Sequence, residues 1–408
     1  MTSSKRAVLE RLYALAPRGA LLGLERVHVA CAALGHPERR FASVHIAGTN
    51  GKGSVAAMVD AMARAAGLRV GLYTSPQLVR FAERIQVGGE PVSDDQLVAS
   101  LEGVLDRFPE LTFFETATVA AFVLFADTKV ELAVVEVGLG GRLDATNVLE
   151  APRATAITRI ALDHTDRLGS DLASIAREKA GILKPSVPAV LGPLDAISMT
   201  EVRAVAERVN APLRLTAGDD ELASFVARHP PGLAGAHQIE NAQVAVALAQ
   251  ELALPIAAMA RGLGEARWPG RMETLATAEG PVLLDAAHNP DGARALAFAL
   301  ATEARDPAQV ALVFGAMADK DAFTMLTTLA PHALHRFYVS PEGRRAIDPA
   351  ELRASHSGVV AADVPDALAR ARATVGPEGL ILVTGSIFLV GAVRAHLLGL
   401  PRDPAVAL

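Results

Sequence analysis

The sequence predicts an α/β protein with parallel-type sheets, made of a larger N-terminal domain and a smaller, Rossmann-like C-terminal domain. Short apolar runs alternate with longer segments of helical periodicity, which is the pattern of repeated β-α-β units. The 408 residues exceed what one hydrophobic core usually organises. The alternation stops at the Arg-Trp-Pro-Gly-Arg stretch 267–271 and then restarts. We therefore expect a domain boundary between residues 1–268 and 269–408.

Composition excludes several classes of protein. The net charge is 39 − 45 = −6, which argues against a general nucleic-acid binder or a polybasic membrane surface. Cys31 is the only cysteine, so neither an intramolecular disulfide nor a cysteine-based zinc site is possible. We find no apolar signal core and no apolar run of membrane length. A cytoplasmic protein is expected, and without heptads or a long apolar edge strand it is expected to be a monomer.

The first predicted elements lead into a glycine-rich loop. Residues 5–35 have the pattern of two helices joined by a loop, and the apolar run 44–47 reads as a strand. The loop Gly48-Thr49-Asn50-Gly51-Lys52-Gly53-Ser54 follows, and small residues typical of a helix continue over 55–62. Strand, glycine loop and helix together form the arrangement that cradles phosphates, as in a P-loop ATPase domain.

Two side chains of this loop fit phosphate chemistry. Lys52 would reach the outer phosphates, and the Ser54 hydroxyl would lie near Mg²⁺. The spelling differs from the common phosphate-loop pattern, because Gly53 separates the lysine from the serine and Ile46 stands at the usual first glycine. The alternative is a glycine-rich turn without a ligand.

The next stretch completes a β-α-β unit. Residues 69–73 read as a second strand that ends in Thr-Ser-Pro-Gln-Leu at 74–78, so the sheet is expected to be parallel. Residues 84–92 resemble a small hairpin, and helices are expected near 94–107 and 115–127.

A carboxylate ends the following strand. Residues 131–137 form a buried-type strand that carries Glu136 at its carboxyl end and continues into the glycine-rich stretch 138–147. Burying this carboxylate is costly unless it binds something. In a phosphate-loop protein the partner is usually Mg²⁺. The alternative is a helix-capping or ion-paired acid.

The strand expected at 154–158 leads to Asp163-His164, at the sheet edge where ligands of open α/β sheets gather. The following helix, near 175–182, ends at a glycine and carries Lys179. From spacing alone, Lys179 would be an ordinary surface lysine. Beyond it we expect further strands from 187 and helices near 197–209, 241–252 and 256–265.

The second half repeats the alternation. Strands are expected at 281–285, 308–314, 334–339 and 379–384, with helices between them. Polar clusters follow three of these strands, at 285–290, 315–321 and 384–386. Polar groups at strand ends indicate a binding edge, although Asp, Asn and Gly at such places also cap helices.

The ordered set of motifs resembles one family over nearly the whole chain. The set comprises HIAGTNGKGS at 45–54, TSPQL at 74–78, EVGLGGRLDATN at 136–147, Asp163-His164, EKAGI at 178–182, Pro-Gly-Arg at 269–271, DAAHNP at 285–290, Asp-Lys-Asp at 319–321 and Gly385-Ser386. Each motif alone is weak, whereas the order is specific. The chain resembles the folylpolyglutamate synthase/dihydrofolate synthase branch of the Mur ligase superfamily.

That resemblance implies an ATP-dependent ligase that joins L-glutamate to dihydropteroate or to reduced folates through an acyl phosphate. A carboxylate is a poor electrophile, and phosphorylation corrects this, so the site must hold two anions together with Mg²⁺, lysine and backbone N–H donors.

The family's site residues carry over as follows. Residues 49–54 would hold the ATP phosphates, Ser75 and Glu136 one Mg²⁺, and His164 a second. The family has a carbamylated lysine at the position of Lys179, and this requires a lowered pKa because only the neutral amine reacts. The family's positions that bind the nucleotide from across the domain interface match Asn241, Arg271 and Asp285. Its glutamate-pocket positions match His288 and Ser386.

The pterin-binding elements of the bifunctional enzymes resemble three stretches, which contain Leu22, Gly23 and Leu24; Thr112, Phe113, Phe114 and Glu115; and Leu143, Asp144 and Ala145. Phe114 would stack on the pterin, while Asp144 or the nearby backbone would meet its polar edge. One of the two phenylalanines is expected to pack in the core instead. Gln77 departs from the family, which often has histidine there, so the pterin-side loop is expected to differ.

Alternatives remain at this stage. The enzyme could extend polyglutamate chains only, or be another Mur-type amino-acid ligase. Ligases of the cell wall carry a nucleotide-sugar-binding domain before the phosphate loop, and 47 residues before Gly48 are too few for one. A catalytically idle nucleotide-binding regulator is disfavoured because Lys52, Glu136 and Lys179 are all present.

Overall fold

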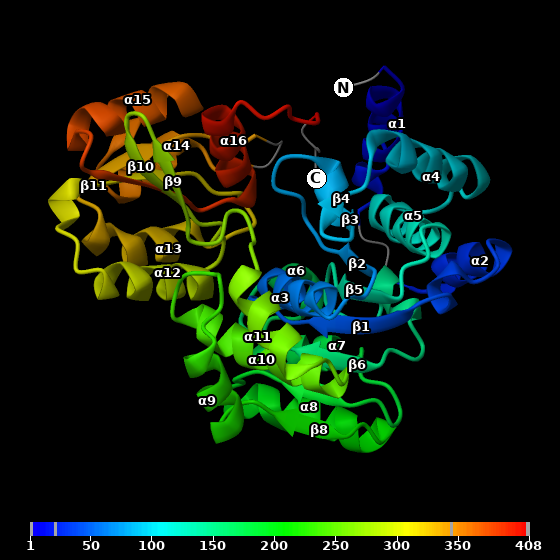
Figure 1. Cartoon of the computed structure of the whole chain (residues 1–408). Coiled ribbons are helices and arrows are strands. Elements are labelled where there is room, and N and C mark those ends of the chain that lie inside the picture. Colours follow the sequence, from blue (N-terminus) through cyan, green and yellow to red (C-terminus); the bar gives the residue numbers. More distant parts are fainter. Residues whose placement is uncertain (1–2, 20–22, 343–345, 405–408) are drawn as a thin grey trace. The chain divides into compact units, whose positions relative to one another are not determined.

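The computed structural model describes residues 3–19, 23–342 and 346–404, and it divides into two compact units (Figure 1). The first unit comprises Met1–Gln77, Phe81–Gly232 and Gln238–Arg267, and the second comprises Leu78–Arg80, Leu233–His237 and Trp268–Leu408. The main junction thus lies at Arg267/Trp268, beside the predicted boundary. The two short segments that join the second unit were not predicted.

The first unit contains a sheet with the strand order β4-β3-β2-β5-β1-β6-β7-β8. Six neighbouring strands are parallel: β1 (Ala42–Ala47), β2 (Val70–Tyr73), β5 (Leu132–Glu136), β6 (Ala154–Ile157), β7 (Ala189–Leu191) and β8 (Leu213–Leu215). The hairpin β3 (Ile85–Val87) and β4 (Glu90–Pro91) adds antiparallel strands at one edge. The parallel sheet and the hairpin predicted from the sequence are therefore confirmed.

The helices of the first unit surround this sheet. They are α1 (Ser3–Tyr13), α2 (Glu25–Ala33), α3 (Lys52–Ala65), α4 (Asp94–Arg107), α5 (Phe113–Asp127), α6 (Thr165–Leu168), α7 (Leu172–Ala180), α8 (Ala196–Val209), α9 (Asp220–Arg228), α10 (His237–Glu251) and α11 (Ile256–Glu265). Two of them begin with a complete capping box, Ser93 with Gln96 for α4 and Thr112 with Glu115 for α5. Such a box satisfies N–H groups that a helix start leaves unpaired.

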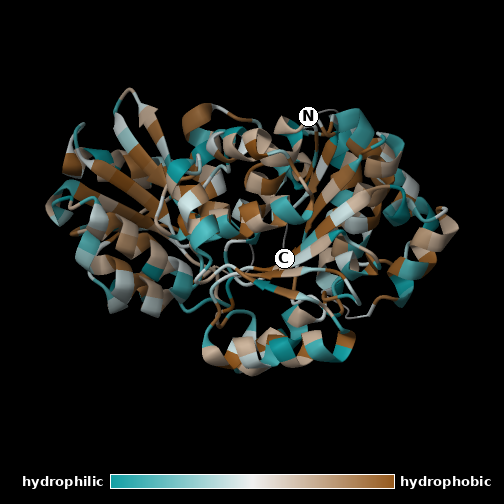
Figure 2. Cartoon of the chain, turned by 60° about the horizontal axis from the view of Figure 1, so that its bottom comes forward, coloured by the Kyte–Doolittle hydropathy of each residue, from teal (hydrophilic) through white to brown (hydrophobic). Residues whose placement is uncertain are grey.

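The strands at the centre of the sheet are buried along their whole length. Every residue of β2, β5 and β6 is buried, and so is β1 from Ser43 to Ala47. Their apolar character is visible as brown arrows in Figure 2. Parallel strands covered by helices on both faces require such sequences. Few polar residues lie within these strands, His45 of β1 and Thr155 of β6 among them, and the site lies where the strands end.

The second unit is a smaller α/β unit with the strand order β13-β12-β11-β14-β10-β9. Its strands are β9 (Glu273–Thr277), β10 (Gly280–Leu284), β11 (Val310–Phe314), β12 (His335–Tyr338), β13 (Val359–Val360) and β14 (Leu380–Thr384). Its helices are α12 (Pro290–Thr302), α13 (Ala322–Leu329), α14 (Pro349–Ser355), α15 (Val364–Val375) and α16 (Ile387–Leu398). Only β9 is antiparallel to its neighbour, and neither β9 nor β13 was predicted.

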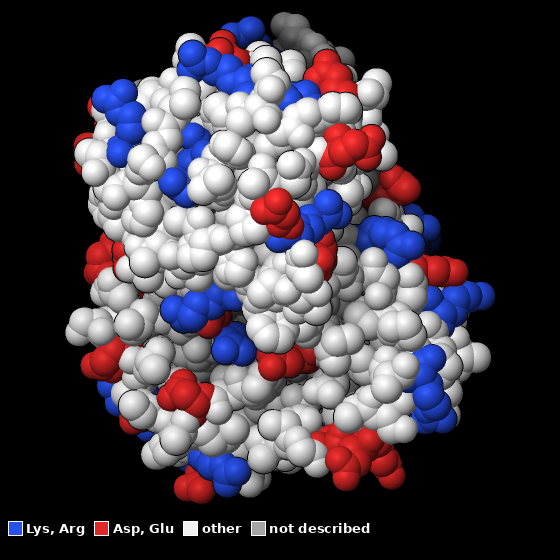
Figure 3. Space-filling view, turned by 90° about the vertical axis from the view of Figure 1, so that its left-hand side faces the viewer, with Lys and Arg blue, Asp and Glu red and all other residues white. Residues whose placement is uncertain are grey.

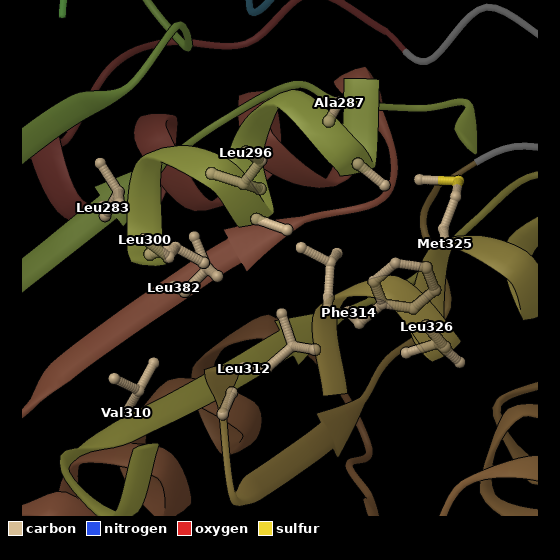
Figure 4. Packing of buried hydrophobic residues seen from close by; sticks show 14 of the residues in the cluster. Leu283, Ala287, Leu296, Leu300, Val310, Leu312, Phe314, Met325, Leu326 and Leu382 are labelled. Atoms are coloured by element: carbon tan, nitrogen blue, oxygen red, sulfur yellow. The ribbon is translucent and has the colours of Figure 1, made fainter. Parts of the chain in front are cut away.

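A leucine-rich core lies between this sheet and helices α12 and α13 (Figure 4). Leu296 and Leu300 of α12 and Leu326 of α13 pack with strand residues such as Leu312 and Leu382. Side chains buried to this degree each contribute about 1.5–3 kcal/mol through removal of apolar surface from water. This core fixes the strand ends of the second unit.

On the face shown in Figure 3, basic and acidic side chains are interspersed between wide uncharged areas. That face therefore offers no extended field of one sign to a polyanion. Within the described part of the chain, no helix combines the length and the apolar character that crossing a membrane requires.

Candidate active site

The glycine loop follows β1, which lies between β5 and β6 in the sheet. Gly51 has φ 89°, and a Cβ atom there would clash with the Asn241 amide, so the loop needs glycine at this point. The Thr49 N–H donates to the Arg159 carbonyl at 2.6 Å, and the Thr158 hydroxyl donates to the Asn50 carbonyl at 2.7 Å. The neighbouring strand thereby holds the loop in a fixed curve.

Helix α3 begins at Lys52, so its N-terminal N–H groups belong to the loop. The Lys52 ammonium donates to the Thr49 carbonyl at 3.1 Å and lies 3.8 Å from Glu136 Oε1. Backbone donors, a helix N-terminus and a cation are thus gathered within one short segment. Together they form a site with the charge and the donors for a polyphosphate.

Gln238 belongs to this site although the sequence analysis did not identify it. Its amide nitrogen donates to Ser54 Oγ at 3.3 Å, and its amide oxygen accepts from Asn241 Nδ2 at 3.0 Å. Ser54 and Gln238 are both buried. The available signal was the spacing of three residues between Gln238 and Asn241, which places both on one face of a helix.

Glu136 is the last residue of β5 and pairs in register with Ile46 of β1. Its side chain is buried, and Oε2 accepts a hydrogen bond from the Ser75 N–H at 3.2 Å. Among the described residues there is no group of three or more His, Cys, Asp and Glu side chains that could hold a metal by themselves. One carboxylate with an adjacent serine hydroxyl nevertheless fits Mg²⁺, which takes few protein ligands and completes its shell with phosphate and water.

His164 follows β6 at the same edge, in the left-handed conformation with φ 50°. Its ring is 40% exposed, and Nε2 lies 3.9 Å from Asp163 Oδ1. A partly exposed imidazole at a strand end can contact a ligand, but the role of His164 in metal binding stays a prediction.

Lys179 is buried, so the expectation of a surface lysine from spacing alone is wrong. Its ammonium donates to the Gly48 carbonyl at 2.8 Å, across 131 residues of sequence. Burial lowers the pKa of Lys179 to about 7, and the positive charge of Lys52 adds to this effect. At neutral pH a substantial fraction of this amine is therefore uncharged, which is the form that reacts with carbon dioxide.

The loop between β5 and β6 is organised by Asp144. This buried carboxylate accepts hydrogen bonds from the Leu139 N–H, the Thr146 N–H and the Thr146 hydroxyl at 2.8, 3.0 and 2.5 Å. Thr146 Oγ1 also lies 2.8 Å from Nε2 of the buried His45. Burial raises the pKa of Asp144. The carboxylate of Asp144, which lies between Leu143 and Ala145 in the sequence, is therefore occupied by hydrogen bonds within its own loop. The backbone of this loop is left to bind the polar edge of a ligand.

The first two phenylalanines of α5, Phe113 and Phe114, differ as expected. Phe113 is buried against Tyr13 and Phe81, with ring centroids 6.0 and 6.1 Å apart, so it is the core residue of the pair. Phe114 is only partly buried, and its ring lies so close to Gly138 that a Cβ atom there would clash with it. Phe114 therefore borders the loop that follows the Glu136 strand.

Thr112 and Glu115 act first on the protein itself. They form the capping box of α5, and the Glu115 carboxylate also accepts from Arg26 Nη2 at 2.7 Å. Their polar atoms are therefore occupied in the structure. Gly23 and Leu24 immediately precede α2, whereas Leu22 lies outside the described residues.

The predicted residues of the second unit also gather at strand ends. Asp285 follows β10 and accepts from the Met272 and Ala287 N–H groups, both at 3.0 Å. The Arg271 guanidinium donates to the Gly270 carbonyl at 3.1 Å, and His288 Nδ1 lies 3.0 Å from the Ala286 carbonyl. Ser386 caps α16 by accepting from the Phe388 N–H at 3.2 Å. Asp285 and Ser386 thus have structural partners, and the ligand contacts of all four residues stay predictions.

Two family descriptions match the chain. Residues 46–229 match the Mur ligase middle domain, and residues 270–387 match the Mur ligase glutamate ligase domain. Among curated proteins, the dihydrofolate synthase/folylpolyglutamate synthase of Bacillus subtilis is 34% identical over 92% of this chain and 95% of its own length. The protein of the same name from Mycobacterium tuberculosis is 36% identical, over 93% and 90%.

Solved structures agree with these matches. The folylpolyglutamate synthase of Mycobacterium tuberculosis complexed with ADP and AMPPCP has a TM-score of 0.87 at 32% identity, over 98% of this chain and 100% of that one. The Escherichia coli protein in complex with DHPP and ADP has a TM-score of 0.87 at 30% identity, over 97% and 98%. A bifunctional folylpolyglutamate synthase/dihydrofolate synthase with Mn, AMPPNP and L-glutamate bound has a TM-score of 0.83 at 32% identity, over 93% and 95%.

Proposed function

Because the chain belongs to the dihydrofolate synthase/folylpolyglutamate synthase family of ATP-dependent Mur ligases, we propose that it joins L-glutamate both to dihydropteroate and to the γ-carboxylate of reduced folates. The observation that carries the proposal is the first unit's site. In this site the glycine loop, the Glu136 carboxylate and the buried Lys179 lie together. Lys52 lies between Thr49 and Glu136.

The loop from Thr49 to Ser54 binds the ATP phosphates through its backbone N–H groups. Lys52 neutralises charge on the outer phosphates, which makes it the first catalytic residue of the proposal. Asn241 adjoins Gly51 and reaches Ser54 through Gln238, so the start of α10 supports the loop from one side. Arg271 and Asp285 are proposed to contribute to nucleotide binding from the second unit.

Ser75 and Glu136 would hold one Mg²⁺, and His164 would help to hold a second. The hydroxyl and the single buried carboxylate suit a hard cation that retains water and phosphate oxygens. Bound there, Mg²⁺ supplies positive charge that offsets the repulsion between the ATP phosphates and the acceptor carboxylate. Solved relatives with Mn and nucleotide analogues support a divalent cation in this family.

The reaction balances in two steps. An oxygen of the acceptor carboxylate attacks the γ-phosphorus, the bond to the β-phosphate oxygen breaks, and ADP leaves. The amine of L-glutamate then attacks the carbonyl carbon of the acyl phosphate. The carbon–oxygen bond to the phosphate breaks, inorganic phosphate leaves, and the amine nitrogen releases one proton and keeps one N–H in the amide.

Lys179 is proposed to be carbamylated, so that a buried cation becomes an anion facing the phosphate loop. Three features support this: its burial, its bond to the Gly48 carbonyl and its lowered pKa. An uncarbamylated ammonium beside Lys52 would add a second positive charge to the same small volume. The carbamate instead gives the site a further oxygen donor.

Phe114 and the backbone of the loop around Asp144 are proposed to bind the pterin of the acceptor. The ring of Phe114 offers a flat apolar surface beside Gly138, and the buried Asp144 keeps the loop in one conformation. His288 and Ser386 are proposed to bind L-glutamate. His288 is held by the Ala286 carbonyl and would act on the incoming amine.

The experiment supplies the purified protein with ATP, Mg²⁺ and L-glutamate, together with either dihydropteroate or tetrahydrofolate. ADP release and the masses of the products are measured. Ligation of both acceptors is the expected result. Ligation of tetrahydrofolate alone would make the protein a chain-extending synthase and remove the pterin role of Phe114 for dihydropteroate. Ligation of neither would contradict the proposed function.

A further inference from the structure

Arg84 is a buried arginine near Ser75 and Glu136, the residues proposed to hold Mg²⁺. The reaction proposed above gives Arg84 no role. It ends the short turn Phe81–Arg84 after β2, and its carbonyl accepts from the Thr74 N–H at 3.0 Å. Thr74 precedes Ser75, whose own N–H donates to Glu136 at 3.2 Å. Arg84 therefore lies at the carboxyl end of β2. Its backbone pairs with Thr74, the residue that precedes Ser75.

The partners of Arg84 are unusual for a buried cation. The side chain is 3% exposed, and its guanidinium lies 5.4 Å from the Phe81 ring centre and 5.2 Å from that of Phe113. Its hydrogen bond is donated from Nε to Gln77 Oε1 at 2.5 Å. Among the described residues, no carboxylate forms an ion pair with it, although the charge of Glu136 lies within electrostatic reach.

This set of partners leaves the charge of Arg84 incompletely compensated. Contacts with two aromatic faces offset only part of the cost of removing a cation from water. The two terminal nitrogens of the guanidinium carry four N–H groups, and the single bond to Gln77 uses none of them.

Two terminal nitrogens with parallel N–H groups match the two oxygens of a carboxylate. Gln77 is well suited to orient them, because an amide is uncharged at every pH and accepts from Nε without repelling the guanidinium. This also gives a physical role to the residue that departs from the family's usual histidine. Since the proposed acceptor must bring a carboxylate to the side of Ser75 and Glu136, the missing anion has a natural source.

We propose that Arg84, held in place by Gln77, binds the carboxylate of the pterin-bearing acceptor before that carboxylate is activated. Arg84 is thus a substrate-binding residue, and Gln77 is a positioning residue that acts through it. The inference rests on the proposed function, because it takes the acceptor from there. It assigns a ligand contact to Arg84, a residue to which neither the motif comparison nor the geometry of the proposed Mg²⁺ site gives a role.

The main competing explanation is purely structural. Arg84 could serve only to fill the space between Phe81 and Phe113, and its replacement would then loosen the fold without any preference for charged ligands. The two explanations differ in one measurable quantity, the selectivity of the protein for an acid over its uncharged amide. A structural defect weakens the binding of both ligands, whereas loss of a carboxylate contact weakens only that of the acid.

The test measures equilibrium binding of dihydropteroate and of its carboxamide to the full-length wild type and to Arg84→Met, which keeps length and removes charge. Hydrogen bonds to charged groups are worth about 1.5–3 kcal/mol, so we expect about 10- to 100-fold weaker binding of the acid. Binding of the amide should change less than twofold. Gln77→Leu should show a smaller loss that is again confined to the acid, with the KM for dihydropteroate raised and kcat little changed.

Arg107→Met is the matched control, because Arg107 also stacks on a phenylalanine, Phe108, at 5.3 Å, and donates to the Ala33 carbonyl. It should leave both affinities unchanged. Equal losses for acid and amide in Arg84→Met, or no loss for either, would overturn the proposal. If Arg84→Met does not fold, Arg84→Lys decides the same comparison, since it keeps the charge but loses the two-pronged geometry. A wild type that ligates neither acceptor would instead contradict the proposed function.

Discussion

At the scale of single residues, the burial of Lys179 determines much of the chemistry available to the site. Carbamylation requires the neutral amine, and a pKa of about 7 means that this form prevails above neutrality and declines below it. The rate at which a carbon dioxide-depleted enzyme regains activity on adding bicarbonate should therefore fall as the pH decreases from 8 to 6. An amine of ordinary pKa would be almost fully protonated over that whole range.

Lys179→Ala should lower ligation by at least 100-fold, because the site loses both the amine and its carbamate. Short carboxylic acids added to the assay should restore part of the activity by supplying the missing oxygen donors. Steady-state ADP release with and without acetate measures the effect, and Lys184→Ala serves as a control lysine in the same unit. Full activity of Lys179→Ala would contradict the proposed role of the carbamate.

A second residue-scale prediction concerns the buried chain that joins His45, Thr146 and Asp144. Thr146→Val removes the hydroxyl and leaves the other two polar groups without it, and each such buried group costs about 1–3 kcal/mol. We expect a loss of about 2–4 kcal/mol in the free energy of unfolding, measured by urea denaturation. Thr128→Val, which removes a partly exposed hydroxyl at the end of α5, should cost less than about 1 kcal/mol.

At the scale of elements, helix α3 carries the nucleotide loop and is positioned by its close packing on α11. Gly262 of α11 lies against the backbone of Ala61 and Met62, so that a Cβ atom at this position would clash with α3. Gly262→Ala should therefore destabilise the protein by about 1–3 kcal/mol and weaken ATP binding. Thermal unfolding and nucleotide titration measure the two effects.

Gly264 provides the control on the same helix. A Cβ atom there would meet only the Pro230 carbonyl at 3.9 Å, an ordinary contact. Gly264→Ala should be neutral or stabilising by up to about 1 kcal/mol, because it restricts the unfolded chain without straining the folded one. Equal effects of the two substitutions would contradict the role assigned to the packing of α3 on α11.

The elements that the sequence predicted are those with strong periodicity. The parallel strands and helices such as α4, α8 and α11 lie where expected, because continuous apolar runs and capping residues mark them. Strand β9 was missed because its residues alternate between partial and full exposure, and β13 because it has only two residues. Local patterns of that kind carry too little hydrophobic signal to be separated from loops.

The site was predictable only where a motif lies within one segment. The loop 48–54 and Glu136 were identified by their position at strand ends, whereas the contact of Lys179 with Gly48 spans 131 residues and no local spacing reveals it. The resemblance to a known family placed Lys179 in the site, but it did not predict the contact with Gly48. It gave no role to Gln238 or Arg84, whose partners depend on how distant segments meet.

At the scale of the whole molecule, the two units have separate cores, and the proposed ATP phosphate contacts lie in the first. A nonhydrolysable ATP analogue with Mg²⁺ at about 100 times its Kd should stabilise the protein by about 2.7 kcal/mol, because it binds only the folded state. Differential scanning calorimetry should show the shift in the transition of the first unit. Lys52→Met should abolish it, and a shift of equal size in that variant would contradict the loop assignment.

The most direct test of the account follows one oxygen atom. Dihydropteroate labelled with ¹⁸O in both carboxylate oxygens is incubated with the protein, ATP, Mg²⁺ and L-glutamate, and the released phosphate is analysed by mass spectrometry. Activation through an acyl phosphate transfers one carboxylate oxygen to phosphate, so each phosphate released with product should carry a single ¹⁸O. Unlabelled phosphate accompanying dihydrofolate formation would show that the carboxylate is not phosphorylated and would contradict the account.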